Sequence, residues 1–382
     1  MADKATESSV VGRAARRGAG IACVLVLAST IFLRTPAPAA SPDSTFFRIG
    51  GTKVEDAAFR WSAAIAGVAS RPPGLPACDV GGTCGIPGVI AVAQTFESPQ
   101  ALIRAVAAGT VESGIASANM VQASRCDSKG GDGKSAQQDL RVLANLYREQ
   151  LHLVARRDAK IASPADLAGK TVIVGEKDSA AELAARALFD AAGVAKKIKF
   201  QNATWPAAIE ALEANKVPAA IFLGPVPDPR LVDAAQAGDL MLVPITGGTA
   251  QKLVKAGTVF APEQISADAY PGLGAASTIA QFVQWVVRDK LDPGLAYKLT
   301  QAAWAPANRK RIVDMVQPIV AGELGTAWTE VPAPVDEGAK RYYTEKGVPG
   351  SELACPSEPV TPSAPPAPAT PAAATNRPHV RS

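Results

Sequence analysis

Residues 140–155, with the sequence LRVLANLYREQLHLVA, decide how the rest of this chain is organised. They form two extended apolar runs, Leu140–Leu146 and Gln150–Ala155, separated by three residues. Short apolar runs of this kind are typical of β-strands. One set of short strands and helices precedes the two runs, and a second set follows them. We therefore expect two lobes, with strands that cross between them as a hinge.

Both sets alternate short apolar runs with amphipathic helices, which is the pattern of an α/β fold with a mostly parallel sheet. The strands predicted in the first set are Thr45–Ile49, Val89–Thr95 and Ser113–Ala116. Those predicted in the second set are Thr171–Val174, Ile198–Gln201, Ala219–Leu223 and Leu240–Ile245. Ser98 and Ser179 have the sequence context of helix N-caps, because Pro99 and Glu182 follow them at the expected spacing. An alternating strand is predicted again at Ser277–Val287.

These patterns predict a lobe 1 made of residues 44–146 and 246–355, and a lobe 2 made of residues 147–245. The hinge is expected near Leu146–Gln150 and again near Pro244. Ligands of open α/β sheets bind beyond the carboxyl ends of the strands. The cleft between the lobes is therefore the expected binding site.

The two ends of the chain differ in composition from the middle. Within residues 1–40, Arg13, Arg16 and Arg17 precede an apolar run of 15 residues at Ala19–Leu33, and the small residues Ala37–Ala40 follow it. This pattern predicts a signal peptide and export, with an uncleaved membrane anchor as the alternative. Residues 356–382 are rich in Pro and Ala, which predicts a disordered tail.

The charge and the inventory of reactive residues exclude several classes of function. The formal net charge of +4 comes from the two ends, so the middle of the chain is neutral. Nucleic-acid binding needs clustered positive charge, and we expect no nucleic-acid partner. The two histidines are His152 and His379, and no catalytic motif, phosphate loop or metal-ligand spacing accompanies them. We therefore predict a protein that is not an enzyme, with no metal site and no cofactor.

Four cysteines lie outside the predicted signal peptide: Cys78, Cys84, Cys126 and Cys355. An even number of cysteines in an exported chain indicates disulfides. Cys78 and Cys84 flank a turn-rich loop, which favours a bond between them. A bond between Cys126 and Cys355 then follows by elimination, although the sequence leaves the other two connectivities open.

Several short motifs occur in order along the middle of the chain: Phe46–Gly50, Ile90–Gln94, Val111–Gly114, Leu143–Tyr147 with Leu151–Arg156, Ala165–Lys170 and Gly338–Tyr343. Together they resemble the TAXI family of solute-binding proteins of TRAP transporters, from about Thr45 to Gly347. The resemblance implies a type II periplasmic-binding-protein-like fold whose two lobes close on a small organic anion, often a dicarboxylate or an amino acid. It also implies a periplasmic monomer that delivers its solute to a TRAP-type membrane permease.

The loops expected to line the cleft depart from the family pattern. Where the family has a Thr-Tyr step after the first strand, this chain has Ala57 and Ala58. The candidate ligand-binding residues are polar residues at strand ends and helix starts: Thr52, Lys53, Thr95, Ser98, Ser117, Asn119, Lys177 and Ser179. Each of them has an alternative role as an ordinary turn, cap or surface residue. The added charges in these loops predict a solute that is amino-acid-like or carries an amine, rather than a simple dicarboxylate.

Two further hypotheses use the same scaffold. In one, the protein is a sensory or interaction protein of the cell envelope that has lost transport binding. In the other, an enzyme has evolved on the two-lobed fold. The second has less support because nucleophile, base and metal ligands are missing as recognisable sets.

Overall fold

The structure, a computed structural model, describes residues 44–76, 84–126 and 138–356. The predicted signal peptide at 1–40 and all but the first residue of the predicted tail at 356–382 lie outside these ranges. Within the described ranges, no helix has both the length and the hydropathy needed to cross a membrane.

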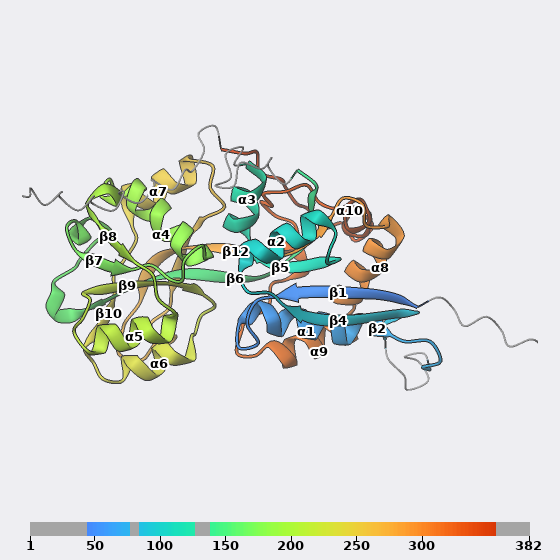
Figure 1. Cartoon of the computed structure of the whole chain (residues 1–382), viewed down its shortest axis with the longest axis horizontal. Coiled ribbons are helices and arrows are strands. Elements are labelled where there is room, and N and C mark those ends of the chain that lie inside the picture. Colours follow the sequence, from blue (N-terminus) through green and yellow to red (C-terminus); the bar gives the residue numbers. More distant parts are fainter. Residues whose placement is uncertain (1–43, 77–83, 127–137, 357–382) are drawn as a thin grey trace, which may run out of the picture. The chain divides into compact units, whose positions relative to one another are not determined.

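A mixed sheet of 10 strands forms the centre of the described chain (Figure 1). Its strands are β1 (Thr45–Gly51), β4 (Val89–Thr95), β5 (Ser113–Ser117), β6 (Leu140–Arg156), β7 (Thr171–Ile173), β8 (Lys199–Gln201), β9 (Ala219–Gly224), β10 (Leu240–Leu242), β11 (Ala261–Ile265) and β12 (Ala276–Arg288). The order is β4-β1-β5-β12-β6-β9-β7-β8, with β10 beside β6 and β11 beside β12. The short strands β2 (Ser70–Arg71) and β3 (Ile86–Pro87) form a separate pair.

Helices cover both faces of this sheet. They are α1 (Ala57–Ala69), α2 (Pro99–Ala108), α3 (Ala118–Cys126), α4 (Ala180–Ala191), α5 (Trp205–Glu213), α6 (Pro229–Ala235), α7 (Gly247–Lys255), α8 (Pro293–Trp304), α9 (Pro306–Val316) and α10 (Glu337–Glu345). The two predicted N-caps are confirmed, since Ser98 Oγ accepts a hydrogen bond from Ala101 N at 3.2 Å and Ser179 Oγ accepts one from Glu182 N at 3.1 Å. Gly109, at a φ of 73°, ends α2 in the left-handed conformation that glycine adopts without strain.

The long strands β6 and β12 lie side by side along most of their length. The prediction of two separate runs at Leu140–Leu146 and Gln150–Ala155 is wrong, because the residues between them continue the strand. Tyr147, Arg148 and Glu149 keep their pairing with β12, so β6 is one strand of 17 residues. At one end, β12 pairs with β5, and at the other it pairs with β11. Strand β12 therefore pairs with β5 in one part of the sheet and with β11 in the other, and β6 runs beside it between them.

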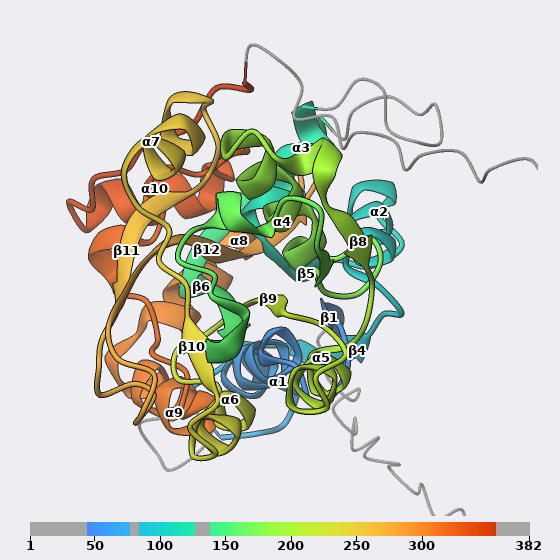
Figure 2. The ribbon, with the colours of Figure 1, turned by 90° about the vertical axis from the view of Figure 1, so that its left-hand side faces the viewer.

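The buried apolar side chains divide the described chain into two lobes. One cluster contains residues from Phe47 to Tyr147 and from Val283 to Tyr343, and we call the elements around it lobe 1. Two further clusters, with residues from Leu151 to Ile279, lie on opposite faces of the sheet, and we call the elements around them lobe 2. Figure 2 views lobe 2 with α4 and α7 on one side of its strands and α5 and α6 on the other.

Each lobe is an α/β unit with parallel strands, and the lobes share β6 and β12. The predicted α/β class, with the arrangement of a type II periplasmic-binding-protein-like fold, is confirmed. The lobes divide further along the chain than the predicted boundary at residue 246. Leu253, Phe260 and Tyr270 pack in the clusters of lobe 2. The predicted boundary lies too early in the chain because the sequence pattern did not predict α7 and β11.

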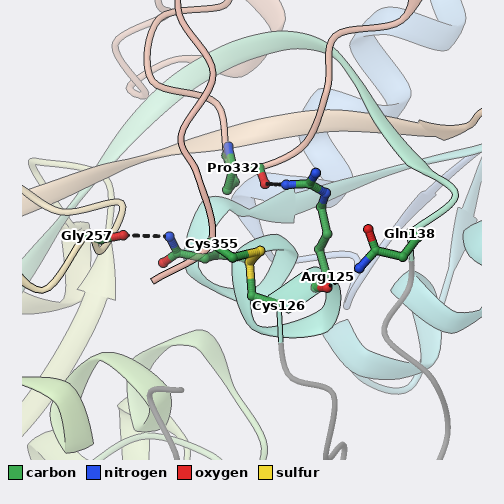
Figure 3. Close-up of a disulfide and its surroundings, with 7 residues drawn as sticks. Arg125, Cys126, Gln138, Gly257, Pro332 and Cys355 are labelled. Carbon is green, nitrogen blue, oxygen red and sulfur yellow. Dashed lines mark hydrogen bonds between the residues drawn. A yellow bond between two sulfur atoms is a disulfide. The ribbon is translucent and has the colours of Figure 1, made fainter. Parts of the chain in front are cut away.

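A disulfide joins Cys126, at the end of α3, to Cys355 near the end of the described chain (Figure 3). Its Cα atoms lie 5.4 Å apart. Next to it, Arg125 Nη1 donates a hydrogen bond to Pro332 O at 3.0 Å. This pairing is the one predicted by elimination. Cys78 lies outside the described residues, so its bond to Cys84 stays a prediction.

Candidate functional site

The candidate site lies where β6 and β12 pass from one lobe to the other. At this junction Glu149 pairs with Gln281 and Arg148 pairs with Phe282. Successive side chains of a strand point to opposite faces. Glu149 and Gln281 therefore face one side of the crossing strands, whereas Arg148 and Phe282 face the other.

On the first side, a buried network of hydrogen bonds links the lobes. Glu149, which is 6% exposed, accepts a hydrogen bond from Gln281 Nε2 at 2.7 Å and another from the Ser117 hydroxyl. Gln281 Oε1 accepts from Asn119 N at 2.8 Å, and Gln281 Nε2 also donates to Asn119 Oδ1 at 3.1 Å. Asn119 Nδ2 in turn donates to the carbonyl oxygen of Ala180, the first residue of α4, at 2.9 Å. We call Ser117, Asn119, Glu149 and Gln281 the junction network.

Burial controls the protonation of the junction network. It raises the pKa of Glu149 to about 7, although the hydrogen bonds from Ser117 and Gln281 act in the opposite direction. Tyr147, on the same face of β6, stacks on Trp61 with ring centres 5.5 Å apart. Burial, followed by the charges of Glu149 and Asp56, raises the pKa of Tyr147 well above its usual value. Around neutral pH, Glu149 is the group here whose charge changes.

A second contact between the lobes involves the turn after β1. Lys53 Nζ lies 2.7 Å from Glu176 Oε1, in the loop before α4. The hydrogen bond to Glu176 raises the pKa of Lys53, so this ammonium stays charged. Within the turn, the Thr52 hydroxyl donates to Asp56 Oδ2 at 2.6 Å.

The structure brings part of the predicted ligand-binding set together. Ser117 and Asn119 meet in the junction network, and Lys53 reaches the loop that carries Lys177. Ser98 and Ser179 cap helices, Thr52 stabilises its own turn, and Thr95 and Lys177 are exposed. A contact between any of these residues and a solute stays a prediction.

On the opposite face of the crossing strands there is a pocket of about 370 Å³. Both lobes contribute to its walls, through both long strands, the end of β11, the segment after β9 and the segment after α9. The lining residues are Arg148, Gln150, Pro225, Val226, Gln264, Ser266, Phe282, Val320, Ala321, Gly322, Glu323 and Thr326. None of the eight predicted ligand-binding residues is among them.

Backbone contacts hold the segment after α9 against β6. Ala321 forms a bridge with Tyr147, and Gly322 N donates to Leu146 O at 2.7 Å. A Cβ atom at Gly322 would lie 2.9 Å from Leu146 O, so only glycine allows this approach. The wall of the pocket therefore depends on a glycine that its sequence context did not single out.

Two polar groups of the pocket keep unused capacity for hydrogen bonds. The Arg148 guanidinium lies 5.0 Å above the Phe282 ring, and its Nε is 3.4 Å from Glu263 Oε2. In the described part of the chain, neither Arg148 Nε nor the buried Oε1 of Gln150 has a hydrogen-bond partner. A guanidinium binds a carboxylate through two parallel hydrogen bonds, and an amide oxygen accepts from an N–H or O–H group. The pocket therefore combines a guanidinium that is paired with Glu263, an amide group and an aromatic wall, and a solute reaches the buried Arg148 Nε and Gln150 Oε1 only after these side chains change conformation.

Little in the sequence indicates this pocket. Arg148 lies in the gap between the two predicted runs and Gln150 lies beside it, and the sequence pattern predicts a hinge there. The only available sign was that this polar gap contains neither Gly nor Pro, which allows the strand to continue. Within the described ranges, no group of three or more His, Cys, Asp or Glu side chains comes together that could hold a metal ion.

Among solved structures, the chain is similar to a sulfonate-binding protein, SsuA, from Methylobacillus flagellatus, with 14% identity and a TM-score of 0.41 over 72% of this chain and 73% of that one. It is similar to a periplasmic binding protein from Brucella ovis with glutathione bound, with 12% identity and a TM-score of 0.40 over 69% and 68% of the two chains. A TctC solute-binding protein from Polaromonas matches with 14% identity and a TM-score of 0.42 over 73% and 91%.

A model of one protein family matches residues 86–347, which is more than half of the sequence. The match includes β4 to α10, and with them both long strands and every residue of the junction network and the pocket. The chain belongs to the NMT1-like family.

Proposed function

We propose that this protein is a periplasmic solute-binding protein of a TRAP-type secondary transporter, similar to the TAXI proteins. It captures a small polar organic solute between its lobes and delivers it to a membrane permease. The observation that carries this proposal is the pocket at the junction, because both lobes supply its walls. A solute that contacts both walls stabilises the arrangement in which they are close, and so links binding to closure.

The size and chemistry of the pocket limit the class of solute. A volume of 370 Å³ corresponds to roughly a dozen water molecules, which suits a solute of similar size. Arg148 is placed to bind a carboxylate, and Gln150 Oε1 to accept from an ammonium or amide group. Glu323 adds a negative charge to the same lining. We therefore propose an amino-acid-like or amine-bearing carboxylate as the solute.

A thermal-shift screen of amino acids, amines and carboxylates tests this proposal. A true solute at a hundredfold excess over its Kd stabilises the folded protein by about 2.7 kcal/mol. The variant Arg148→Ala should need at least a tenfold higher concentration for the same shift. The matched control is Arg311→Ala on α9, which removes an exposed arginine and should respond like the wild type. A solute that stabilises Arg148→Ala as well as the wild type would exclude the pocket as its site.

One observation favours a second function, a sensory or interaction protein of the envelope. The loops that were predicted to line the cleft are already engaged with each other, through Lys53 with Glu176 and Asn119 with Ala180. If no amino acid, amine or carboxylate raises the melting temperature, the second function becomes the better explanation.

A further inference from the structure

Glu149 is buried at the junction and takes no part in the pocket. It lies on the face of β6 opposite Arg148, and its carboxylate faces Gln281 and Ser117. The residue is 6% exposed. Burying a carboxylate is costly unless a cation or several hydrogen-bond donors compensate for the lost water.

The charged groups around Glu149 do not supply that cation. The titratable groups on the facing segments are Tyr147 on β6, Lys53, Glu55 and Asp56 after β1, Arg125 on α3, Glu176, Lys177 and Asp178 before α4, and Glu182 and Arg186 on α4; Lys177 is exposed. Lys53 binds Glu176, Arg186 binds Glu182, and Arg125 donates to Pro332 O. Within the described ranges, Glu149 forms no ion pair. Its ionised form would be a buried charge with two neutral donors.

The junction network connects the charge of Glu149 to lobe 2. One Gln281 side-chain nitrogen, Nε2, donates both to Glu149 Oε1 and to Asn119 Oδ1. This fixes the Asn119 amide so that its Nδ2 faces the carbonyl oxygen of Ala180. Glu149, Gln281 and Asn119 thus form one continuous path from the crossing strands to the start of α4.

We infer that Glu149 is a proton-binding group that couples the contact between the lobes to pH, with the proton bound when the lobes meet at Asn119 and Ala180. Loss of the proton leaves an unpaired charge in the junction, and separation of the lobes admits the water that solvates it. Acid therefore favours closure and alkali favours opening. This coupling needs no solute, so it stands apart from the proposed transport function.

The size of the effect follows from linkage. A carboxyl with a pKa of about 7 in the closed arrangement and 4.5 when hydrated binds its proton more tightly when the lobes are closed. Between pH 5.5 and pH 8.5 the ratio of closed to open protein should fall roughly 30-fold. The Lys53–Glu176 ion pair also joins the lobes, and the hydrogen bond to Glu176 raises the pKa of Lys53, which moves it further from neutrality.

Distances between two spin labels can test this directly, on the full chain without solute. The labels are placed at Arg104 on α2 in lobe 1 and at Lys196, just after α4 in lobe 2, which are both exposed and belong to elements on the side of the sheet where Asn119 meets Ala180 (Figure 1). In the wild type we expect the short distance of the present arrangement to dominate at pH 5.5 and to lose population at pH 8.5. Glu149→Gln, an uncharged isostere, should keep the short distance at both pH values.

Two variants complete the test. Asn119→Ala removes the bond to Ala180 O, and should show the longer distance already at pH 5.5. Lys53→Met also weakens the contact between the lobes, but should retain the pH response of the wild type. A wild-type distance distribution that is the same at both pH values would overturn the inference. An equal pH response in Glu149→Gln would overturn it as well, with circular dichroism confirming that the variant is folded.

Discussion

Removal of the Cys126–Cys355 disulfide should lower the stability of the protein by a large and calculable amount. The bond closes a loop with a sequence separation of 229 residues. In the chain-entropy model, opening a loop of this length lowers the free energy of the unfolded chain by about 5 kcal/mol at 25 °C, so the free energy of unfolding falls by the same amount. The folded state should change little, because Leu353 N still donates to Val331 O at 2.8 Å and Val331 N to Ser351 O at 3.0 Å.

The assay is urea denaturation of the wild type and of the double variant Cys126→Ser with Cys355→Ser, both kept oxidised. The control is the same comparison under reducing conditions, where both proteins lack the bond and should unfold at similar urea concentrations. A difference below about 1 kcal/mol between the oxidised proteins would refute the reasoning. It would mean that residues 126 and 355 are already held close together in the unfolded chain.

Three further changes test individual polar groups. Glu149→Gln should stabilise the protein by an amount that rises from near zero at pH 4.5 to at most about 3 kcal/mol above pH 7, because the pKa of about 7 in the closed folded state lies above the unfolded value of 4.5 and opening of the lobes relieves part of the cost. Urea denaturation at several pH values measures this, and a difference that is constant with pH would contradict it. Tyr270→Phe should lower the free energy of unfolding by about 1–3 kcal/mol. The Tyr270 hydroxyl accepts a hydrogen bond from Asp228 N at 2.8 Å and is hydrogen-bonded to His152 Nε2 at 2.8 Å, and both partners are buried. The control Tyr297→Phe, whose hydroxyl donates to Glu345 at an exposed site, should cost less. Ser98→Ala should lower the free energy of unfolding by about 1 kcal/mol in the same assay, because α2 loses its N-cap. An unchanged urea midpoint would show that the cap does not stabilise the protein.

Elements with strong local signals could be predicted from the sequence. Helix α4 begins with a Ser that caps and a Glu three residues later, and α2 begins with Ser and Pro and ends at Gly109. Helix α7 was missed because only Ala250 and Leu253 of its nine residues are buried, which leaves no clear apolar stripe. Strand β11 was missed because it contains Pro262 and alternates with exposed polar residues, as expected for a strand at the edge of a sheet.

The site was predictable only where it depends on strand ends. Ser117 and Asn119 were expected at the cleft because they stand where the TAXI family has a cleft loop, and Ser117 does meet Glu149 while Asn119 meets Gln281 and α4. The pocket combines Arg148 and Gln150 with segments 225–226 and 320–326, which are brought together by long-range pairing of β6 with β9 and with the segment after α9. No local pattern in a single sequence specifies such a combination, since each segment taken alone resembles an ordinary strand end or loop.

The order Arg148-Glu149-Gln150 assigns two different chemical roles to neighbouring residues of one strand. Arg148 and Gln150 line the pocket, whereas Glu149 belongs to the junction network on the other face. A shift of one residue in the pairing of β6 with β12 would exchange the two faces, placing a carboxylate in the pocket and a guanidinium in the buried network. The register is fixed on both sides, because Leu143 and Leu146 pack in lobe 1 while Leu151 and Leu153 pack in lobe 2. The apolar runs that first indicated the fold therefore also determine which polar groups face the pocket and which belong to the junction network.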